Sequence, residues 1–157
     1  MPYEGRCLCG GCKVFLDDEP RGLGICHCND CSRNSGSPFI CAVFVPSEKV
    51  RIDGPFKIYS YPNSSSGNMV NRWFCTECGS HLASQSSART EYISPRTGIF
   101  EEFKKLPISL EIFTKDRWPS IQPIEGALQS EDGNVPLKIK QHMLTVSEPA
   151  ETRDSKY

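Results

Sequence analysis

The sequence predicts a mainly β protein of one domain, with helices that are short and peripheral. Short runs rich in β-branched and aromatic residues recur between turn-forming residues, whereas the apolar spacing of long amphipathic helices is weak. Glycine and proline each number 12 among the 157 residues, as expected for a chain with many turns. Both observations favour a strand-dominated fold with a modest core.

The individual elements follow in chain order from these runs. The predicted strands are Lys13–Leu16, Phe39–Val45, Val50–Ile52, Phe56–Tyr61, Val70–Phe74 and Ile108–Thr114. Phe39–Val45 is the most continuously apolar run, so we expect that strand, with Cys41, to be buried. A helix is expected at Asn29–Ser35 and a further helical turn near Phe100–Lys105. The polar segment Pro62–Asn68 predicts an exposed hairpin loop.

The length suits one domain, since single cores are commonly built from roughly 100–150 residues. From about Gln129 the chain becomes polar and charged. We therefore expect a zinc-binding domain over residues 1–130 and a polar C-terminal extension over 131–157, in which Lys138–Val146 can add one short element.

Charge and hydropathy exclude several functions. The 18 Lys and Arg nearly balance the 19 Asp and Glu, so no overall field attracts nucleic acid or an anionic membrane. No run approaches the ~20 apolar residues of a membrane helix, and Met1–Glu4 lacks the pattern of a secretory signal. We expect a cytoplasmic protein that binds a small-molecule substrate, with neither nucleic acid nor membrane as its partner.

Cysteine is the most informative residue type. In the cytoplasm the nine thiols stay reduced, which favours metal binding over disulfides. Seven of them fall into closely spaced sets: Cys7 and Cys9; Cys26, Cys28 and Cys31; Cys75 and Cys78. Tight turns, helped by Gly10 and Gly79, can aim such close thiolates at one zinc ion.

Seven thiolates divide into four and three, the numbers of a closed structural zinc site and of a catalytic site with an open position. We assign Cys7, Cys9, Cys75 and Cys78 to a structural zinc, and Cys26, Cys28 and Cys31 to a catalytic zinc. The spacing alone is also compatible with another grouping, such as Cys7, Cys9, Cys26 and Cys28. Cys12 is expected to be a buried thiol, with an extra ligand as the alternative.

Three blocks carry a resemblance to a known family. They are Gly5–Gly10, Cys26–Arg33 with Gly36–Phe39, and Arg72–Ser80; a later segment, Leu110–Phe113 with Trp118, extends it. Over about Gly5–Gln129 the chain resembles the glutathione-dependent formaldehyde-activating enzymes, a family that includes centromere protein V. The resemblance implies packed antiparallel sheets of the tent-like zinc-binding fold, the same four-plus-three division of thiolates, and two Zn²⁺ per chain.

The resemblance also implies carbon–sulfur lyase chemistry on a thiol adduct, with glutathione as a possible cosubstrate. A zinc bound by three thiolates is a weak Lewis acid that suits a soft fourth ligand, which is consistent with this chemistry. The alternatives are a lyase, dehydratase or isomerase acting on a non-thiol small molecule, for example in natural-product biosynthesis, and a non-catalytic binding module stabilised by zinc.

Four residues are predicted to bind the substrate near the open zinc: Arg33, Ser37, Phe39 and Arg72. The arginines can balance the negative charge of the thiolates, and Ser37 and Phe39 belong to the loop that follows Cys31. Each of these residues also has an explanation without a role in binding: the arginines as solvated cations, and Ser37 and Phe39 as parts of a turn.

Three residues are predicted to take part in catalysis: Arg33, His27 and His81. His27 lies between two proposed ligands, so in an extended segment its side chain points away from their sulfurs, which argues against direct zinc ligation. It can still relay protons, as can His81, which follows the closed cluster.

Overall fold

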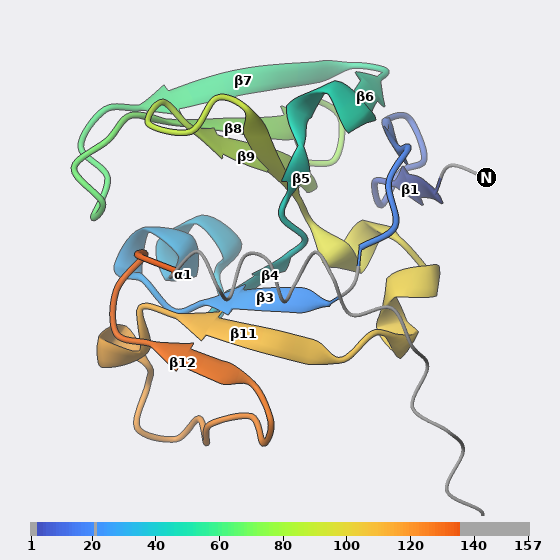
Figure 1. Cartoon of the computed structure of the whole chain (residues 1–157). Helices are drawn as coiled ribbons and strands as arrows, with labels where there is room; N and C mark the ends of the chain where they lie inside the picture. Colours follow the sequence, from blue (N-terminus) through green and yellow to red (C-terminus); the bar gives the residue numbers. More distant parts are fainter. Residues whose placement is uncertain (1–2, 21, 136–157) are drawn as a thin grey trace, which may run out of the picture.

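The computed structural model describes residues 3–20 and 22–135, and within these residues the protein is mainly β, as predicted (Figure 1). The described strands are β1 Tyr3–Arg6, β2 Lys13–Leu16, β3 Leu23–Cys26, β4 Ile40–Ala42, β5 Val45–Pro46, β6 Val50–Asp53, β7 Phe56–Tyr61, β8 Val70–Cys75, β9 His81–Ser86, β10 Tyr92–Pro95, β11 Ile108–Ile112 and β12 Leu128–Ser130. The α-helix is α1 Asn29–Ser35, and the 3₁₀ helices are η1 Ser47–Lys49, η2 Thr97–Ile99, η3 Glu102–Lys105 and η4 Thr114–Asp116.

The strands form three sheets. In spatial order these are β1-β2-β6, β5-β10-β9-β8-β7 and β12-β11-β3-β4. The first two sheets are antiparallel throughout. In the third sheet β3 pairs antiparallel with β4, whereas β11 runs parallel to both β3 and β12. The parallel pairings need long connections, and the chain between β3 and β11 supplies one by building the five-stranded sheet on the way.

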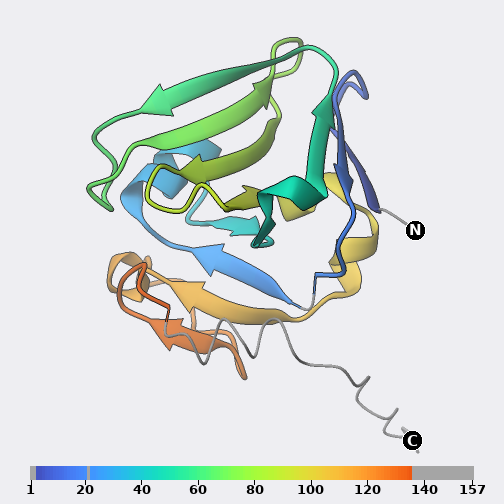
Figure 2. The same ribbon diagram turned by 45° about the horizontal axis from the view of Figure 1, so that its top comes forward.

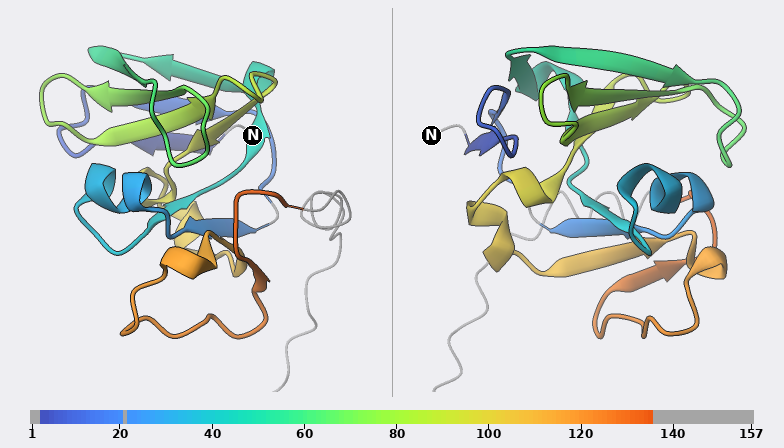
Figure 3. Two further views of the ribbon diagram at one scale, coloured as in Figure 1. Left: turned by 90° about the vertical axis from the view of Figure 1, so that its left-hand side faces the viewer. Right: turned by 180° about the vertical axis from the view of Figure 1, so that it is seen from behind.

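The five-stranded and four-stranded sheets form two layers, and α1 lies between the layers at one side (Figures 1 and 3). The small N-terminal sheet closes the opposite side, as the tilted view also shows (Figure 2). The core is built from apolar side chains of the three sheets and of the η2–η3 segment, including Val14, Leu16, Leu82, Phe100 and Phe103, whereas α1 contributes no buried residue. None of the described helices is long and apolar enough to cross a membrane.

One predicted strand is divided. The run Phe39–Val45 gives β4 in the four-stranded sheet and β5 in the five-stranded sheet. Between them the chain passes from one layer to the other, held by the Val43 N–H, which donates to the Pro95 carbonyl at 3.1 Å. Cys41 on β4 is consequently half-buried, whereas the apolar run around it predicted a buried side chain.

The C-terminal half of the chain shows two further outcomes. Trp118, one of the residues that carry the family resemblance, follows η4 in a loop and is 47% exposed. Most of the predicted extension 131–157, including Lys138–Val146, lies outside the described residues.

Candidate metal centres

Four cysteine sulfurs come together where the N-terminal sheet meets the five-stranded sheet. The Sγ atoms of Cys7, Cys9, Cys75 and Cys78 all lie within 4.8 Å of one another. Cys7 and Cys9 belong to the loop between β1 and β2, while Cys75 ends β8. We call this group the four-sulfur cluster. It joins the two halves of the predicted closed set, which are separated by 66 residues between Cys9 and Cys75.

Two similar turns present these sulfurs. The Gly10 N–H donates to the Cys7 carbonyl at 2.9 Å, and the Gly79 N–H donates to the Cys75 carbonyl at 3.0 Å. Both glycines have positive φ, 77° and 70°, which side chains larger than hydrogen disfavour. Each turn thus returns the chain immediately after a cysteine pair, so that both sulfurs of the pair face the same point.

Cys12 is fully buried beside this cluster, as predicted, and is not one of its four sulfurs. Its N–H donates to Cys7 Sγ at 3.1 Å, and its own thiol donates to the Pro55 carbonyl at 3.2 Å. Burial and neighbouring sulfurs raise the pKa of the Cys12 thiol to about 12, so it stays protonated. Cys12 therefore supports the cluster through its backbone.

Three more sulfurs meet at the end of β3. The Sγ atoms of Cys26, Cys28 and Cys31 lie within 4.8 Å of one another, and we call this group the three-sulfur cluster. Cys28 is also the N-cap of α1, because its Sγ accepts a hydrogen bond from the Cys31 N–H at 3.4 Å. The start of the helix therefore places Cys28 and Cys31 together, and the end of β3 adds Cys26.

Both clusters fit zinc. A Zn–S bond of ~2.3 Å implies about 3.8 Å between the sulfurs of a tetrahedral site. The Cys9 and Cys75 sulfurs are 3.8 Å apart, and those of Cys7 and Cys9 are 3.4 Å apart. Sulfur-only donors also select zinc over hard cations such as Mg²⁺. The two clusters can therefore hold metal ions, with four protein ligands in one and three in the other.

Within the three-sulfur cluster the sulfur of Cys31 is the one favoured as a thiolate, because hydrogen bonds with the neighbouring sulfurs and burial raise the pKa of Cys26, and the pKa of Cys28 is raised as well. Hydrogen bonds from Cys26 and Cys28 lower the pKa of Cys31 to about 3; burial opposes this effect, and the charges of Arg96 and Arg72 assist it. A thiolate is the form that binds zinc.

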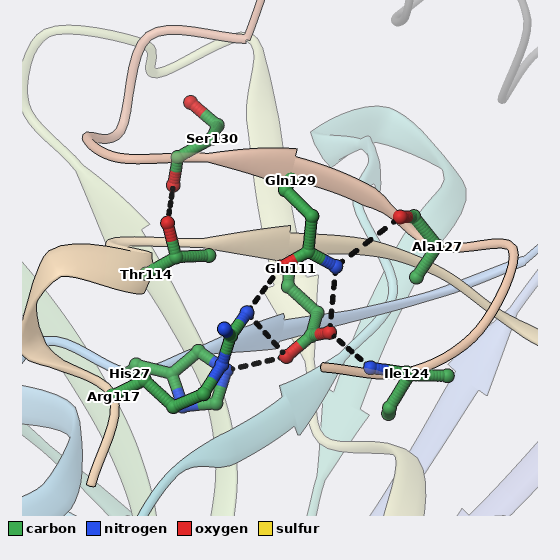
Figure 4. Close-up of polar contacts among 8 residues, drawn as sticks. All are labelled: His27, Glu111, Thr114, Arg117, Ile124, Ala127, Gln129 and Ser130. Carbon is green, nitrogen blue, oxygen red and sulfur yellow. Dashed lines mark hydrogen bonds and ion pairs between the residues drawn. The ribbon is translucent and has the colours of Figure 1, made fainter. Parts of the chain in front are cut away.

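The His27 side chain belongs to a buried polar network around Glu111 (Figure 4). His27 is 1% exposed and Glu111 on β11 is fully buried, with His27 Nε2 2.7 Å from Glu111 Oε2. Glu111 also accepts hydrogen bonds from Arg117 at 3.2 Å, from the Ile124 N–H at 2.7 Å and from Gln129 Nε2 at 2.7 Å. The network thus fixes the backbone between Cys26 and Cys28 to the neighbouring strand.

A cavity of about 240 Å³ adjoins the three-sulfur cluster and lies between the two main sheets. Cys26 and Cys31 form part of its wall, and apolar side chains such as Ile25, Val43 and Leu110 form much of the rest. A second, more open hollow shares Ile40 and Arg96 with this cavity. No sulfur of the four-sulfur cluster lines either space. The two clusters therefore differ in their access to a ligand.

The predicted arginines occupy different places. Arg33 is exposed on α1 and lines neither space. Arg72 on β8 is 8% exposed, and its Nη1 donates to Asn34 Oδ1 at 2.8 Å, which braces α1 against the five-stranded sheet. Arg96, which sequence reasoning did not single out, is 7% exposed and lines both spaces.

The remaining predicted residues lie around the second hollow. His81 and Phe39 line it, and the Phe39 ring meets the His27 ring edge-on at 5.8 Å between centroids. Burial, followed by the charges of Arg96 and Arg72, lowers the pKa of His81. Ser37 lines neither space, and its hydroxyl hydrogen-bonds the Phe39 carbonyl within the loop after α1. The catalytic and substrate-binding roles of these residues stay predictions.

Known proteins resemble this chain in sequence and in fold. An uncharacterized lyase of Schizosaccharomyces pombe is 34% identical over 83 residues, which are 52% of this chain and 57% of that protein, so the match spans little more than half of the relative. A crystal structure of a Rhodobacter sphaeroides protein, a structural-genomics target, superposes with a TM-score of 0.51 over 68% of this chain and 99% of its own. Its sequence identity is 19%, so this likeness concerns the fold.

The family comparison covers both clusters. Residues 2–116 match the family described as glutathione-dependent formaldehyde-activating enzyme. The matched range holds all seven clustered cysteines, together with His27 and its buried partner Glu111. The chain therefore belongs to the glutathione-dependent formaldehyde-activating enzyme family.

Proposed function

We propose that this protein is a zinc-dependent lyase that acts on the carbon–sulfur bond of a thiol adduct of a small carbonyl compound, with glutathione as a candidate thiol. One observation carries the proposal: the cluster with only three sulfurs lines the cavity between the two main sheets, whereas the cluster with four does not. A site built only to hold the fold has no need of an adjoining cavity. The family and the lyase name of the yeast relative agree with an enzyme.

The reaction is simple to balance. In a hemithioacetal, the carbon–sulfur bond breaks and its electron pair leaves with the sulfur, while the hydroxyl group loses its proton and becomes the carbonyl oxygen. When bound, a zinc ion held by three thiolates supplies an open position that suits the soft sulfur of the thiol. The reverse reaction forms the adduct from the same parts.

The protein's own residues contribute orientation, exclusion of water and proton transfer. The apolar walls of the cavity exclude water from the reacting carbon. His81 lies in the adjoining hollow, and its lowered pKa keeps the imidazole neutral near pH 7, so it is available to accept the hydroxyl proton. In this scheme His27 positions the cysteines, because its Nε2 is already committed to Glu111.

A second candidate is a lyase, dehydratase or isomerase that acts on a small molecule without a thiol. The size of the cavity favours it, since about 240 Å³ lies below the roughly 300–1,000 Å³ of typical ligand sites and suits a small, largely apolar body. A purely structural binding module is the weaker alternative, because it leaves the cavity beside the three-sulfur cluster without a use.

Cobalt substitution tests the thiol reaction, because Co²⁺ reports its ligands optically. We expect glutathione to change the sulfur-to-cobalt absorption of the intact protein, and an aldehyde–thiol adduct to be turned over. The Cys28→Ser variant, which lacks one of the three sulfurs, is the control and should show neither effect. Cobalt retained by the protein is measured alongside, since free thiols can remove the metal. If no small thiol perturbs the spectrum and no adduct is turned over, the second candidate replaces the first.

A further inference from the structure

Arg96 is a buried cation with unused hydrogen-bonding capacity. It follows β10, and its backbone N–H donates to the Leu82 carbonyl at 2.9 Å, which fixes its place in the fold. Its side chain is buried, yet Nε and Nη2 have no hydrogen-bond partner among the described residues. Only Nη1 has one, a long 3.5 Å contact with the Ser94 carbonyl. Buried polar groups are almost always paired, so two free donors on one guanidinium point to a missing partner.

The free donors are the two that bind a carboxylate most specifically. Nε and Nη2 form one edge of the guanidinium plane, and this edge matches the two oxygens of a carboxylate in a pair of parallel hydrogen bonds. Arg96 lines the cavity together with Cys26 and Cys31, so a molecule that occupies the cavity can meet the arginine and the three-sulfur cluster at once.

The charges of Cys31 and Cys26 act on Arg96, but no carboxylate or sulfur within the described residues accepts a hydrogen bond from its Nε or Nη2. Among residues 3–20 and 22–135, no acidic side chain forms an ion pair with Arg96 or with its buried neighbour Arg72, whose partner Asn34 is neutral. Asp18 and Glu19 line the same cavity without pairing with Arg96, and Arg89 adds a further cation to the wall. The cluster sulfurs do not accept from its free donors either.

We propose that Arg96 binds a carboxylate group of the substrate side-on, so that the substrate of this site is a small carboxylic acid with an apolar body. The inference rests on the proposed function only for the placement of the reacting carbon toward the three-sulfur cluster. The carboxylate belongs either to the carbonyl part or to the thiol part of the adduct, and both sources offer Arg96 the same chemistry.

Direct binding tests the proposal without requiring turnover. Calorimetry on the zinc-loaded protein compares butyrate with butyramide, which has nearly the same shape and no charge. We expect butyrate to bind about tenfold more tightly or better, since a charge-assisted bidentate pair distinguishes the two. Arg96→Gln should remove this preference and Arg96→Lys should weaken it, because lysine keeps the charge and loses the fork. Arg51→Gln removes an exposed arginine of β6 outside both spaces and should leave the preference intact.

NMR spectroscopy of the wild type gives a second readout, which is needed if the variants do not fold. In the wild type, the Arg96 Nε–H resonance, identified by its absence from the Arg96→Lys spectrum or by assignment, should shift when butyrate is added. A preference that survives in folded Arg96→Gln, or a resonance that does not move, overturns the proposal.

Competition against butyrate then locates the carboxylate. For the carbonyl part, we compare how well succinic semialdehyde and butanal displace bound butyrate. For the thiol part, we make the same comparison between 3-mercaptopropionate and 3-mercaptopropanol. An acid preference that depends on Arg96 in one pair assigns the source, and no such preference in either pair contradicts the proposal. If a carboxylate binds through Arg96 but no thiol changes the cobalt spectrum, the carboxylate proposal stands and the thiol reaction is rejected. Failure of one proposal can therefore be distinguished from failure of the other.

Discussion

At the scale of single residues, Glu111 decides how the three-sulfur cluster is held. It is fully buried on β11 and joins His27, Arg117, Ile124 and Gln129 through one carboxylate (Figure 4). Burial opposes the charge on Glu111, but hydrogen bonds from Gln129 and the Ile124 N–H outweigh it and, with His27 and Arg117, lower its pKa to about 2. The carboxylate is therefore ionised and shared among several donors.

The first residue-scale prediction concerns Glu111→Gln. We expect a loss of roughly 3–5 kcal/mol in the free energy of unfolding, because removing one member of a buried ion pair leaves the others unpaired. The loss should depend on pH. The pKa of Glu111 falls from 4.5 when unfolded to about 2 when folded, so its stabilisation is complete above about pH 4.5 and disappears as the pH falls through about 2.

Urea unfolding of wild type and Glu111→Gln across this pH range measures the difference between their free energies of unfolding. Acid effects on the cysteines are common to both proteins and cancel in this difference. A difference in stability that stays constant from pH 5 to pH 2 would contradict the role given to the ionised carboxylate.

At the scale of elements, the turn between β6 and β7 supports the four-sulfur cluster. Gly54 has φ of 106°, and a Cβ added there would lie 2.2 Å from the Gly11 carbonyl oxygen and 2.9 Å from Cys12 Cα. These are backbone atoms of the loop that carries Cys7 and Cys9, so they cannot move without moving the ligands. The Thr76 N–H donates to the Pro55 carbonyl at 2.9 Å and links the same turn to the second cysteine pair.

The second prediction therefore compares two glycines with positive φ. Gly67, in the loop after β7, has φ of 75° and no atom within 4 Å of an added Cβ. Gly67→Ala should lower the free energy of unfolding by about 1 kcal/mol, because only the unfavourable positive φ acts there. Gly54→Ala should lower it several times more and weaken metal retention at the four-sulfur cluster. Thermal unfolding and zinc content per chain provide the readouts. Equal costs for the two substitutions would show that the turn does not press on the cluster.

At the scale of the whole molecule, each cluster belongs to a different part of the fold. The four-sulfur cluster connects the N-terminal sheet to the five-stranded sheet, whereas the three-sulfur cluster lies within the connection from β3 to α1. A metal in the first cluster cross-links segments that are far apart in the chain, and a metal in the second orders a short local segment. The first should therefore contribute more to folding.

The third prediction is that zinc-loaded wild type contains two metal ions, and that the cysteine substitutions differ in their effects. Cys75→Ser should unfold the domain, because a structural zinc site contributes on the order of 10–16 kcal/mol in zinc-finger peptides. Cys28→Ser should keep the fold and lose one ion. Elemental analysis together with circular dichroism checks both statements. Unfolding of the domain to the same degree by both substitutions would rule out the division into a structural and an open site.

Local patterns determined much of the result. The strands Lys13–Leu16 and Phe56–Tyr61 and the helix Asn29–Ser35 have the predicted bounds, because apolar runs and turn residues encode them within a few positions. The seven clustered cysteines were also identified from spacing, since one tight turn brings each close pair together. By contrast, the strand His81–Ser86 was missed: its sequence is largely polar, and it is a strand because β8 and β10 flank it.

Only the tertiary structure decided which distant residues meet. His27 and Glu111 are 84 positions apart, and no local pattern marks Glu111 as the buried partner. Arg96 follows an ordinary strand, and its importance arises from the cavity that two sheets enclose beside Cys26 and Cys31. The sequence by itself thus determined the β-rich class, the thiolate sets and the family resemblance, because these depend on neighbouring residues. The pairing of the sheets, the burial of charges and the shape of the cavity depend on contacts between segments far apart in the chain.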